Sequence, residues 1–166
     1  MNIRIAGTVN DSIVDGNGLR YTIFVQGCPH HCKGCHNPQT HSFDGGKEVS
    51  TSDLFETITS NTLLDGVTFS GGEPFAQAKP LVELADLIKQ NTNLNIVTYT
   101  GYTFEEIITS NDPDWIALLN STDILIDGKF IEDLKSYELR FRGSSNQRYI
   151  DVKQSLLQHK VVLADI

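Results

Sequence analysis

Three cysteines, Cys28, Cys32 and Cys35, are the only ones in the chain and follow the pattern C-x3-C-x2-C. An odd number of cysteines at such short spacing does not form a disulfide framework. Three thiolates on one short loop can instead bind a single metal centre, and iron–sulfur clusters favour thiolate ligands, usually four of them. Three would bind all but one iron of a cubane cluster and leave that iron open to a small-molecule ligand.

The same loop is compatible with zinc, because zinc binds Cys3His sites and four histidines lie nearby. These are His30, His31, His36 and His41. Unligated thiols are the remaining alternative. We expect His30 and His31 to be hydrogen-bonded or solvated loop residues and not ligands. The loop alone leaves the cluster, zinc and free thiols open.

A second motif, Ser70-Gly71-Gly72-Glu73-Pro74, follows an apolar run. Paired glycines let a ligand approach the backbone closely and leave amide N–H groups free to bind it. The carboxylate of Glu73 can accept hydrogen bonds from an ammonium group. As a bare turn this segment is a weak signal, since glycine and proline are common in loops. Its place one crossover after the cysteines favours an iron–sulfur site over zinc.

The elements around these motifs alternate between strands and helices. Runs rich in β-branched and aromatic residues predict strands at 21–25, 67–70, 94–98 and 124–126. Apolar spacing predicts a helix over 81–88, and a weaker one over 53–59. Two further helices begin at cap signals, the capping box of Thr103 with Glu106 and the pair Asp112-Pro113.

This alternation predicts an α/β fold with parallel strands and right-handed crossovers. Such folds carry their chemistry at the C-terminal ends of the strands. The unusual polar or glycine-rich segments each follow a predicted strand: 27–28, 71–74, 99–102 and 127–129. We therefore expect them to meet at one edge of the sheet.

Length and composition predict one globular domain over residues 1–166. A chain of 166 residues, 39% of them hydrophobic and 20% charged, suits one core. The net charge of −8 argues against a nucleic-acid partner. We find no signal-peptide pattern and no run of the ~18 apolar residues that a membrane span needs, so we expect no membrane contact and a cytoplasmic location.

Three arginines near the C-terminal end, Arg140, Arg142 and Arg148, stand out in this acidic chain. They can pair with surface carboxylates, or bind a carboxylate, a phosphate or an acidic partner segment, because guanidinium groups recognise such anions in bidentate fashion. Asp15 and Arg20 can similarly form an ordinary ion pair. The residues alone leave these choices open.

Together the motifs resemble the radical S-adenosylmethionine superfamily, and within it the anaerobic ribonucleoside-triphosphate reductase activating proteins. The similar stretches run from about residue 5 to residue 152. They comprise 15–20, 24–30 and 35–38, then 69–74, and finally 127–130 with 142–148. The resemblance implies a partial, open (β/α) barrel with mostly parallel strands. It also implies a reaction: a reduced [4Fe-4S] cluster cleaves S-adenosylmethionine, and the resulting radical takes a hydrogen atom from a glycine Cα of the reductase.

The resemblance also implies roles for particular residues. Cys28, Cys32 and Cys35 match the cluster ligands and catalytic positions, and the open iron would take the amino and carboxylate groups of S-adenosylmethionine. The matching cofactor-binding positions are Gly34, His36, Asn37, Gly71, Gly72, Glu73, Asp127 and Lys129. Related activases can carry an acidic residue where this chain has Thr98 and Tyr99, so contacts from that strand are only weak candidates.

The implied partners are the large catalytic subunit of anaerobic ribonucleotide reductase and an external electron donor, such as a flavodoxin-type reductant. Three alternatives remain. The chain could activate another glycyl-radical enzyme of the formate-lyase type, or act on a small molecule. A non-catalytic zinc or electron-transfer module gives no reason for the segment 71–74 to follow a strand.

Overall fold

The computed structural model describes residues 1–165, which form one seven-stranded sheet with helices. The strands are β1 (Asn2–Ser12), β2 (Arg20–Val25), β3 (Lys47–Ser50), β4 (Gly66–Gly71), β5 (Asn95–Tyr99), β6 (Ile124–Asp127) and β7 (Arg148–Asp151). The helices are α1 (Thr51–Ser60), α2 (Ala78–Asn91), α3 (Phe104–Ile108), α4 (Pro113–Ser121) and α5 (Val152–Gln158). Short 3-10 helices occupy η1 (Pro38–Thr40), η2 (Pro74–Gln77) and η3 (Glu132–Leu134). None of the helices in this part of the chain has the length and apolar character for crossing a bilayer.

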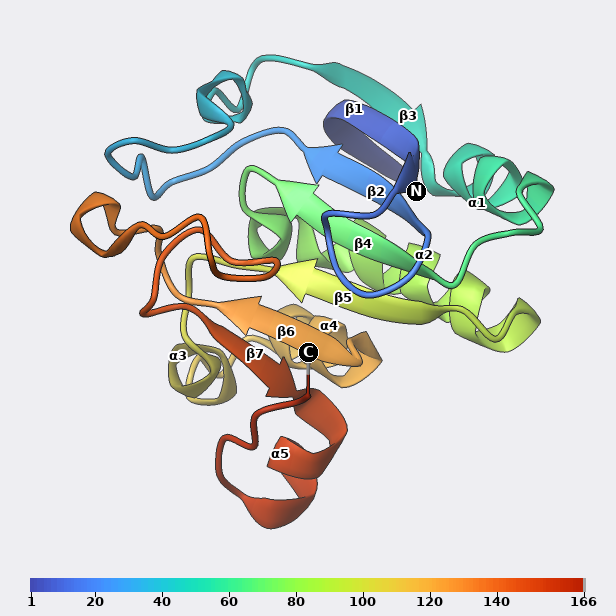
Figure 1. The fold of residues 1–166 in the computed structure, drawn as a ribbon. Coiled ribbons are helices and arrows are strands. Elements are labelled where there is room, and N and C mark those ends of the chain that lie inside the picture. The colour runs from blue at the N-terminus through green and yellow to red at the C-terminus, as the bar shows by residue number, and fades with distance from the viewer. Residues whose placement is uncertain (166) are drawn as a thin grey trace.

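The sheet has the strand order β3-β1-β2-β4-β5-β6-β7. The central strands β2, β4, β5 and β6 pair in parallel, and their arrowheads point the same way in Figure 1. The outer pairs are antiparallel: β1 with β2, β1 with β3, and β6 with β7. The α/β class is thus confirmed, but the expectation of mostly parallel strands was wrong. The outer strands return without a crossover helix, and strands connected in this way pair antiparallel.

The main core lies between the sheet and the helices α1, α2 and α4. Figure 1 shows α2 and α4 on one face of the sheet. Helix α2 buries the predicted apolar stripe of Leu81, Leu84, Ala85 and Ile88. Both halves of the Thr103–Glu106 capping box form at α3, and Asp112 accepts hydrogen bonds from two backbone N–H groups at the start of α4. The periodicity and the cap residues thus account for how these helices begin and pack.

A smaller apolar cluster lies on the opposite face of the sheet. It consists of Val97, Ile126 and Tyr149, whose strand neighbours Ile96, Leu125 and Ile150 belong to the main core. Side chains alternate between the two faces along a strand, so the two clusters lie on opposite sides. The face that carries this small cluster also carries the candidate site.

Candidate functional site

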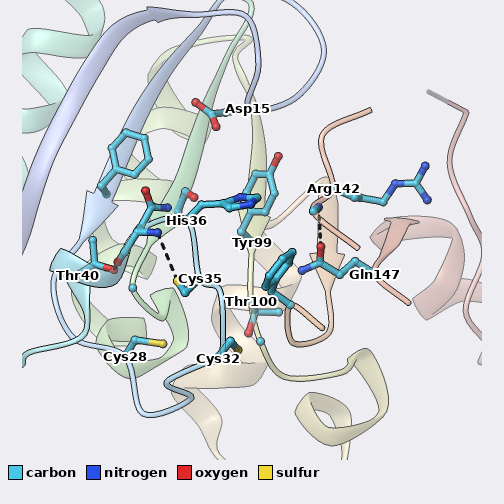
Figure 2. A pocket seen from close by; sticks show the side chains of 18 of the residues that line it. Asp15, Cys28, Cys32, Cys35, His36, Thr40, Tyr99, Thr100, Arg142 and Gln147 are labelled. Atoms are coloured by element: carbon cyan, nitrogen blue, oxygen red, sulfur yellow. Dashed lines mark hydrogen bonds between the residues drawn. The ribbon is translucent and has the colours of Figure 1, made fainter. Parts of the chain in front are cut away.

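A pocket of about 700 Å³ lies beyond the C-terminal ends of the parallel strands. Its walls come from the end of β1 and the loop that follows it, the loop after β2, the turn after β4, the end of β5 and the segment after β6. The predicted site residues that line it are Cys28, Cys32, Cys35, His36, Asn37, Gly71, Gly72 and Lys129. Figure 2 shows the three cysteines on one side of the pocket, facing Tyr99 and Thr100. Segments that follow separate strands in the sequence therefore do share one cavity.

The cysteine loop is held by backbone hydrogen bonds. The N–H of Cys35 donates to the carbonyl of Cys32 at 3.1 Å, which closes a tight turn. Gly34 has φ +75 in that turn, a conformation that favours glycine. The N–H of Cys28 donates to the carbonyl of His41 at 3.1 Å, and the N–H of Asn37 donates to the Cys35 sulfur at 3.4 Å. The loop conformation thus fixes where each cysteine enters the pocket.

The three thiols are free and share the pocket without forming a ready metal-binding group. Within residues 1–165, no three His, Cys, Asp or Glu side chains are arranged as such a group. Burial raises the pKa of the Cys28 thiol. A buried thiol loses its proton readily only when a positive centre offsets the lost hydration, and metal binding does this.

Three predicted site residues do not line the pocket: Gly34, Glu73 and Asp127. Gly34 forms the turn just described. Glu73 is fully buried, and its carboxylate is hydrogen-bonded inside the protein. Asp127 is also fully buried and accepts hydrogen bonds from Arg148 and from the Phe104 N–H at the start of α3. The carboxylates of Glu73 and Asp127 therefore lie behind the pocket wall, whereas their chain neighbours Gly72 and Gly128 line the pocket.

The segment Gly143–Gln147 holds the turn that carries Lys129. The side-chain amide of Asn146 donates to the Lys129 carbonyl at 2.8 Å, and that of Gln147 donates to the Gly128 carbonyl at 3.0 Å. The Gln147 side-chain oxygen accepts from the Gly143 N–H at 2.8 Å, a contact drawn in Figure 2. This stretch is a clamp that fixes the backbone on both sides of Lys129.

The three arginines have separate surroundings. Arg148 pairs with Asp127 across β6 and β7, and its Nε–H donates a hydrogen bond to the Asp127 carboxylate at 3.0 Å. Its guanidinium group also donates to the Glu105 carboxylate at 2.6 Å. The hydrogen bond to Asp127 raises the Arg148 pKa above its ordinary value. Arg140 lies over the Phe141 ring, 4.8 Å from its centroid. Arg142 is the arginine of this group that lines the pocket.

Replacing Arg148 with alanine is expected to lower the free energy of unfolding by about 3 kcal/mol, because the buried Asp127 carboxylate loses its charged partner. Chemical denaturation measures the loss. The Asp127→Asn background should remove most of it, since no buried charge is then left unpaired. Arg140→Ala serves as the surface control, with an expected change of less than about 0.5 kcal/mol. Equal losses for Arg148 and Arg140 would contradict the buried pair.

The sequence analysis did not single out Ile13, Val14, Leu139 or Phe141, which also line the pocket. Asp15 lines the pocket, and its carboxylate accepts hydrogen bonds from the Ser12 and Thr22 hydroxyls. The possible ion pair between Asp15 and Arg20 does not form. Arg20 is itself buried and donates to the Thr68 hydroxyl at 2.7 Å.

The two weak candidates at the end of β5, Tyr99 and Thr98, have different surroundings. Tyr99 lines the pocket and donates its hydroxyl to the Phe141 carbonyl at 2.6 Å, whereas Thr98 is buried against Thr122. The alternation of faces along a strand could have indicated this difference.

Comparisons with known proteins identify the family of this chain. Residues 14–150 match a family described as a 4Fe-4S single cluster domain. The chain is 37% identical to an anaerobic ribonucleoside-triphosphate reductase-activating protein of Haemophilus influenzae, over 81% of this chain and 89% of that protein. Proteins with the same name from Escherichia coli K12 and Enterobacteria phage T4 are 33% and 32% identical, over 81% of this chain and 90% and 85% of theirs.

Among solved structures, QueE from Escherichia coli matches 62% of this chain and 54% of its own, with a TM-score of 0.49 and 22% identity. That partial likeness carries no information about chemistry. The curated relatives match over most of both chains, and the 4Fe-4S domain match at residues 14–150 spans the cysteine loop. The chain therefore belongs to the family of anaerobic ribonucleoside-triphosphate reductase-activating proteins.

Proposed function

We propose that this chain binds a [4Fe-4S] cluster through Cys28, Cys32 and Cys35 and uses it with S-adenosylmethionine to generate a glycyl radical in anaerobic ribonucleotide reductase. One observation carries the proposal. The three thiols share a cavity of about 700 Å³ with the backbone of Gly71 and Gly72 and with Lys129. The names of the curated relatives support the choice of reductase over a formate-lyase type partner.

The donor set of the pocket fits an iron–sulfur cluster. Three free thiols are the ligands that such clusters favour. The Nε2 atom of His41, which lines the same pocket, is buried without a hydrogen-bond partner among the described residues. A buried polar atom of this kind calls for a partner, and a cluster sulfur or a cofactor atom in the pocket would supply one.

The other walls fit S-adenosylmethionine. Gly71 and Gly72 line the pocket with backbone atoms, and Lys129 offers a cation for a carboxylate. The amide expected to be free at Gly72 instead donates to the Val25 carbonyl. His36 and Asn37 lie beside the cysteines and limit the space around a cofactor. A cluster bound by these cysteines would supply the electron for reductive cleavage of S-adenosylmethionine, and the chemistry supplied to the reductase would be removal of a hydrogen atom from a glycine Cα. The chain's own contribution is to bind and orient the reactants.

A protein substrate requires an accessible pocket. Ile13 and Val14 line the pocket, and 70% of the surface of each is exposed. Phe24, Ser70 and Tyr99 line it from the sheet, as they would in a partial, open (β/α) barrel. We propose that a glycine-bearing segment of the large reductase subunit enters here. A flavodoxin-type reductant is the proposed electron donor, and the cytoplasm the proposed location.

The decisive experiment combines anaerobic reconstitution with radical detection. The chain is loaded with iron and sulfide, reduced, and given S-adenosylmethionine with the large reductase subunit. The expected results are stoichiometric methionine release and a glycyl radical by electron paramagnetic resonance. Methionine release with radical formation only on a formate-lyase type enzyme would redirect the proposal to that partner. Tight zinc binding with no cleavage of S-adenosylmethionine would reject it.

Replacing Lys129 with methionine is expected to raise the Kd for S-adenosylmethionine about tenfold or more, because a charged hydrogen bond contributes roughly 1.5–3 kcal/mol. Equilibrium dialysis of the reconstituted protein measures the change. Lys135→Met is the matched control, since Lys135 is exposed on the same segment and lies over the Tyr137 ring. Equal affinities for the two variants would remove Lys129 from the cofactor site.

A further inference from the structure

The carboxylate of Glu73 is enclosed by hydrogen-bond donors from three segments. From the cysteine loop, His30 Nε2 lies 2.6 Å from Oε1. From the end of β5, the Thr100 hydroxyl lies 2.9 and 2.8 Å from the two carboxylate oxygens, and the Gly101 N–H donates to Oε1 at 2.8 Å. From its own turn, the Phe75 N–H donates to Oε2 at 2.9 Å. One side chain thus joins three of the segments that surround the pocket.

These contacts satisfy the charge of Glu73 without a ligand. Its side chain has no exposed surface, and the His30 side chain is only 6% exposed. A buried carboxylate is stable only when it is hydrogen-bonded or paired, and each oxygen here has at least two donors. An ammonium group in the pocket would reach the carboxylate only after breaking some of these bonds. The neighbours that do line the pocket are Gly71 and Gly72.

The backbone next to Glu73 strengthens the same connection. The N–H of Glu73 donates to the Gly27 carbonyl at 2.8 Å, and the N–H of Gly72 donates to the Val25 carbonyl at 2.9 Å. Gly27 immediately precedes Cys28, and His30 lies midway between Cys28 and Cys32. The turn after β4 therefore holds the cysteine loop at two points, one through the backbone and one through the Glu73 carboxylate.

From this geometry we infer that Glu73, His30 and Thr100 are positioning residues: they join the cysteine loop to the ends of β4 and β5, and Glu73 does not contact the ligand. We call this set the Glu73 brace. The existence of the Glu73 brace does not depend on the proposed function, but its expected effect on S-adenosylmethionine binding does. Through the brace, Glu73 acts on the cofactor by fixing the Gly71–Gly72 backbone and the cysteine loop relative to each other.

The first test uses the protein without cluster or cofactor. Glu73→Gln replaces one carboxylate oxygen with an amide N–H₂ group, which faces hydrogen-bond donors and cannot accept from them. His30→Ala removes the hydrogen-bond donor that the cysteine loop supplies. A double-mutant cycle on the free energy of unfolding should show strong coupling, because His30 and Glu73 are direct hydrogen-bond partners 2.6 Å apart. Thr100→Val, which removes one hydroxyl at nearly constant shape, replaces Glu73→Gln in the cycle if that variant does not fold. Additive effects would overturn the brace.

The matched control is His31→Asn. His31 is the adjacent loop histidine, has a φ of +49 that asparagine tolerates, and packs against His41 without contacting Glu73. Its effect should add to that of Glu73→Gln. Coupling as strong as that of His30 would mean that the whole loop responds to any change, and the specific contact would be rejected.

The second test measures S-adenosylmethionine binding after reconstitution. If Glu73 acts through the brace, His30→Ala and Glu73→Gln should both raise the Kd about tenfold or more, and the double variant little further. His30→Gln, which keeps an amide donor near the position of Nε2, should restore most of the affinity. A ligand contact by Glu73 predicts instead that Glu73→Gln alone weakens binding, and this result would overturn the inference.

Iron and sulfide contents are measured in parallel, so that a lost cluster is not mistaken for a lost cofactor contact. If the unmodified protein binds no S-adenosylmethionine, the proposed function fails. The cycle in the cofactor-free protein then still decides whether the brace exists.

Discussion

Alanine in place of Cys28, Cys32 or Cys35 is expected to abolish the iron–sulfur cluster and, with it, S-adenosylmethionine cleavage. Each thiolate supplies one of three protein ligands, and the chain holds no fourth cysteine to replace it. The fold should persist, because Cys32 and Cys35 are partly exposed and the loop lies outside the main core. Cys28 is buried, so Cys28→Ala is expected to lower the free energy of unfolding the most of the three variants.

Iron and acid-labile sulfide content, visible absorption and far-UV circular dichroism measure these outcomes. Lys33→Ala is the control, because Lys33 lies between Cys32 and Cys35 and its side chain is 93% exposed. Its Nζ atom lies 3.9 Å from Glu132 Oε2, a weak surface contact, so this variant should keep a full cluster. A cysteine variant with the iron content of the unmodified protein would remove that cysteine from the ligand set.

Gly72→Ala is expected to reduce stability and cluster retention together. A Cβ at this position would lie 2.3 Å from the Gly27 carbonyl oxygen and 3.0 Å from that of Thr40. Both are backbone atoms, so the loop that carries Cys28 must move. We expect a loss of roughly 1–3 kcal/mol in the free energy of unfolding, as for other overpacked sites. Iron content after reconstitution should fall as well.

Gly7→Ala is the matched control, because a Cβ there would meet nothing within 4 Å. Thermal unfolding and iron analysis of the two variants give the comparison. If Gly72→Ala keeps the melting temperature of Gly7→Ala but loses only S-adenosylmethionine affinity, the glycine serves the ligand and not the loop. That outcome would favour the original interpretation of the motif.

The sequence predicted the centre of the sheet well and its edges poorly. The four predicted strands are found as β2, β4, β5 and β6, and the four predicted helices as α1 to α4. Strands β1, β3 and β7 and helix α5 were missed. Strand β1 reads Asn-Ile-Arg-Ile-Ala-Gly-Thr-Val-Asn-Asp-Ser and is broken by glycine and polar residues, and β3 and β7 have four residues each. Such strands form because a neighbour supplies the hydrogen bonds, which local propensity does not reveal.

The site shows a similar division. Spacing and strand ends predicted which segments meet, because parallel strands bring their C-terminal ends to one edge. Burial of the carboxylates was not predictable in this way. Glu73 is enclosed by His30 and Thr100, and Asp127 by Arg148, and these partners are far apart in the sequence. An acidic residue at a strand end looks the same in sequence whether it faces a ligand or a buried donor.

The clamp at Gly143–Gln147 has a consequence for the timing of assembly. The cysteine loop leaves the ribosome early, whereas Arg142, Gly143 and Gln147, which complete the pocket wall, follow much later. At elongation rates of about 5 to 20 residues per second, the interval between Cys35 and Gln147 is roughly 6 to 22 seconds. During that time the thiols are present without the pocket that surrounds them. A cofactor that needs every wall can bind only after translation has passed Gln147, so the order of the chain makes cofactor loading a late step.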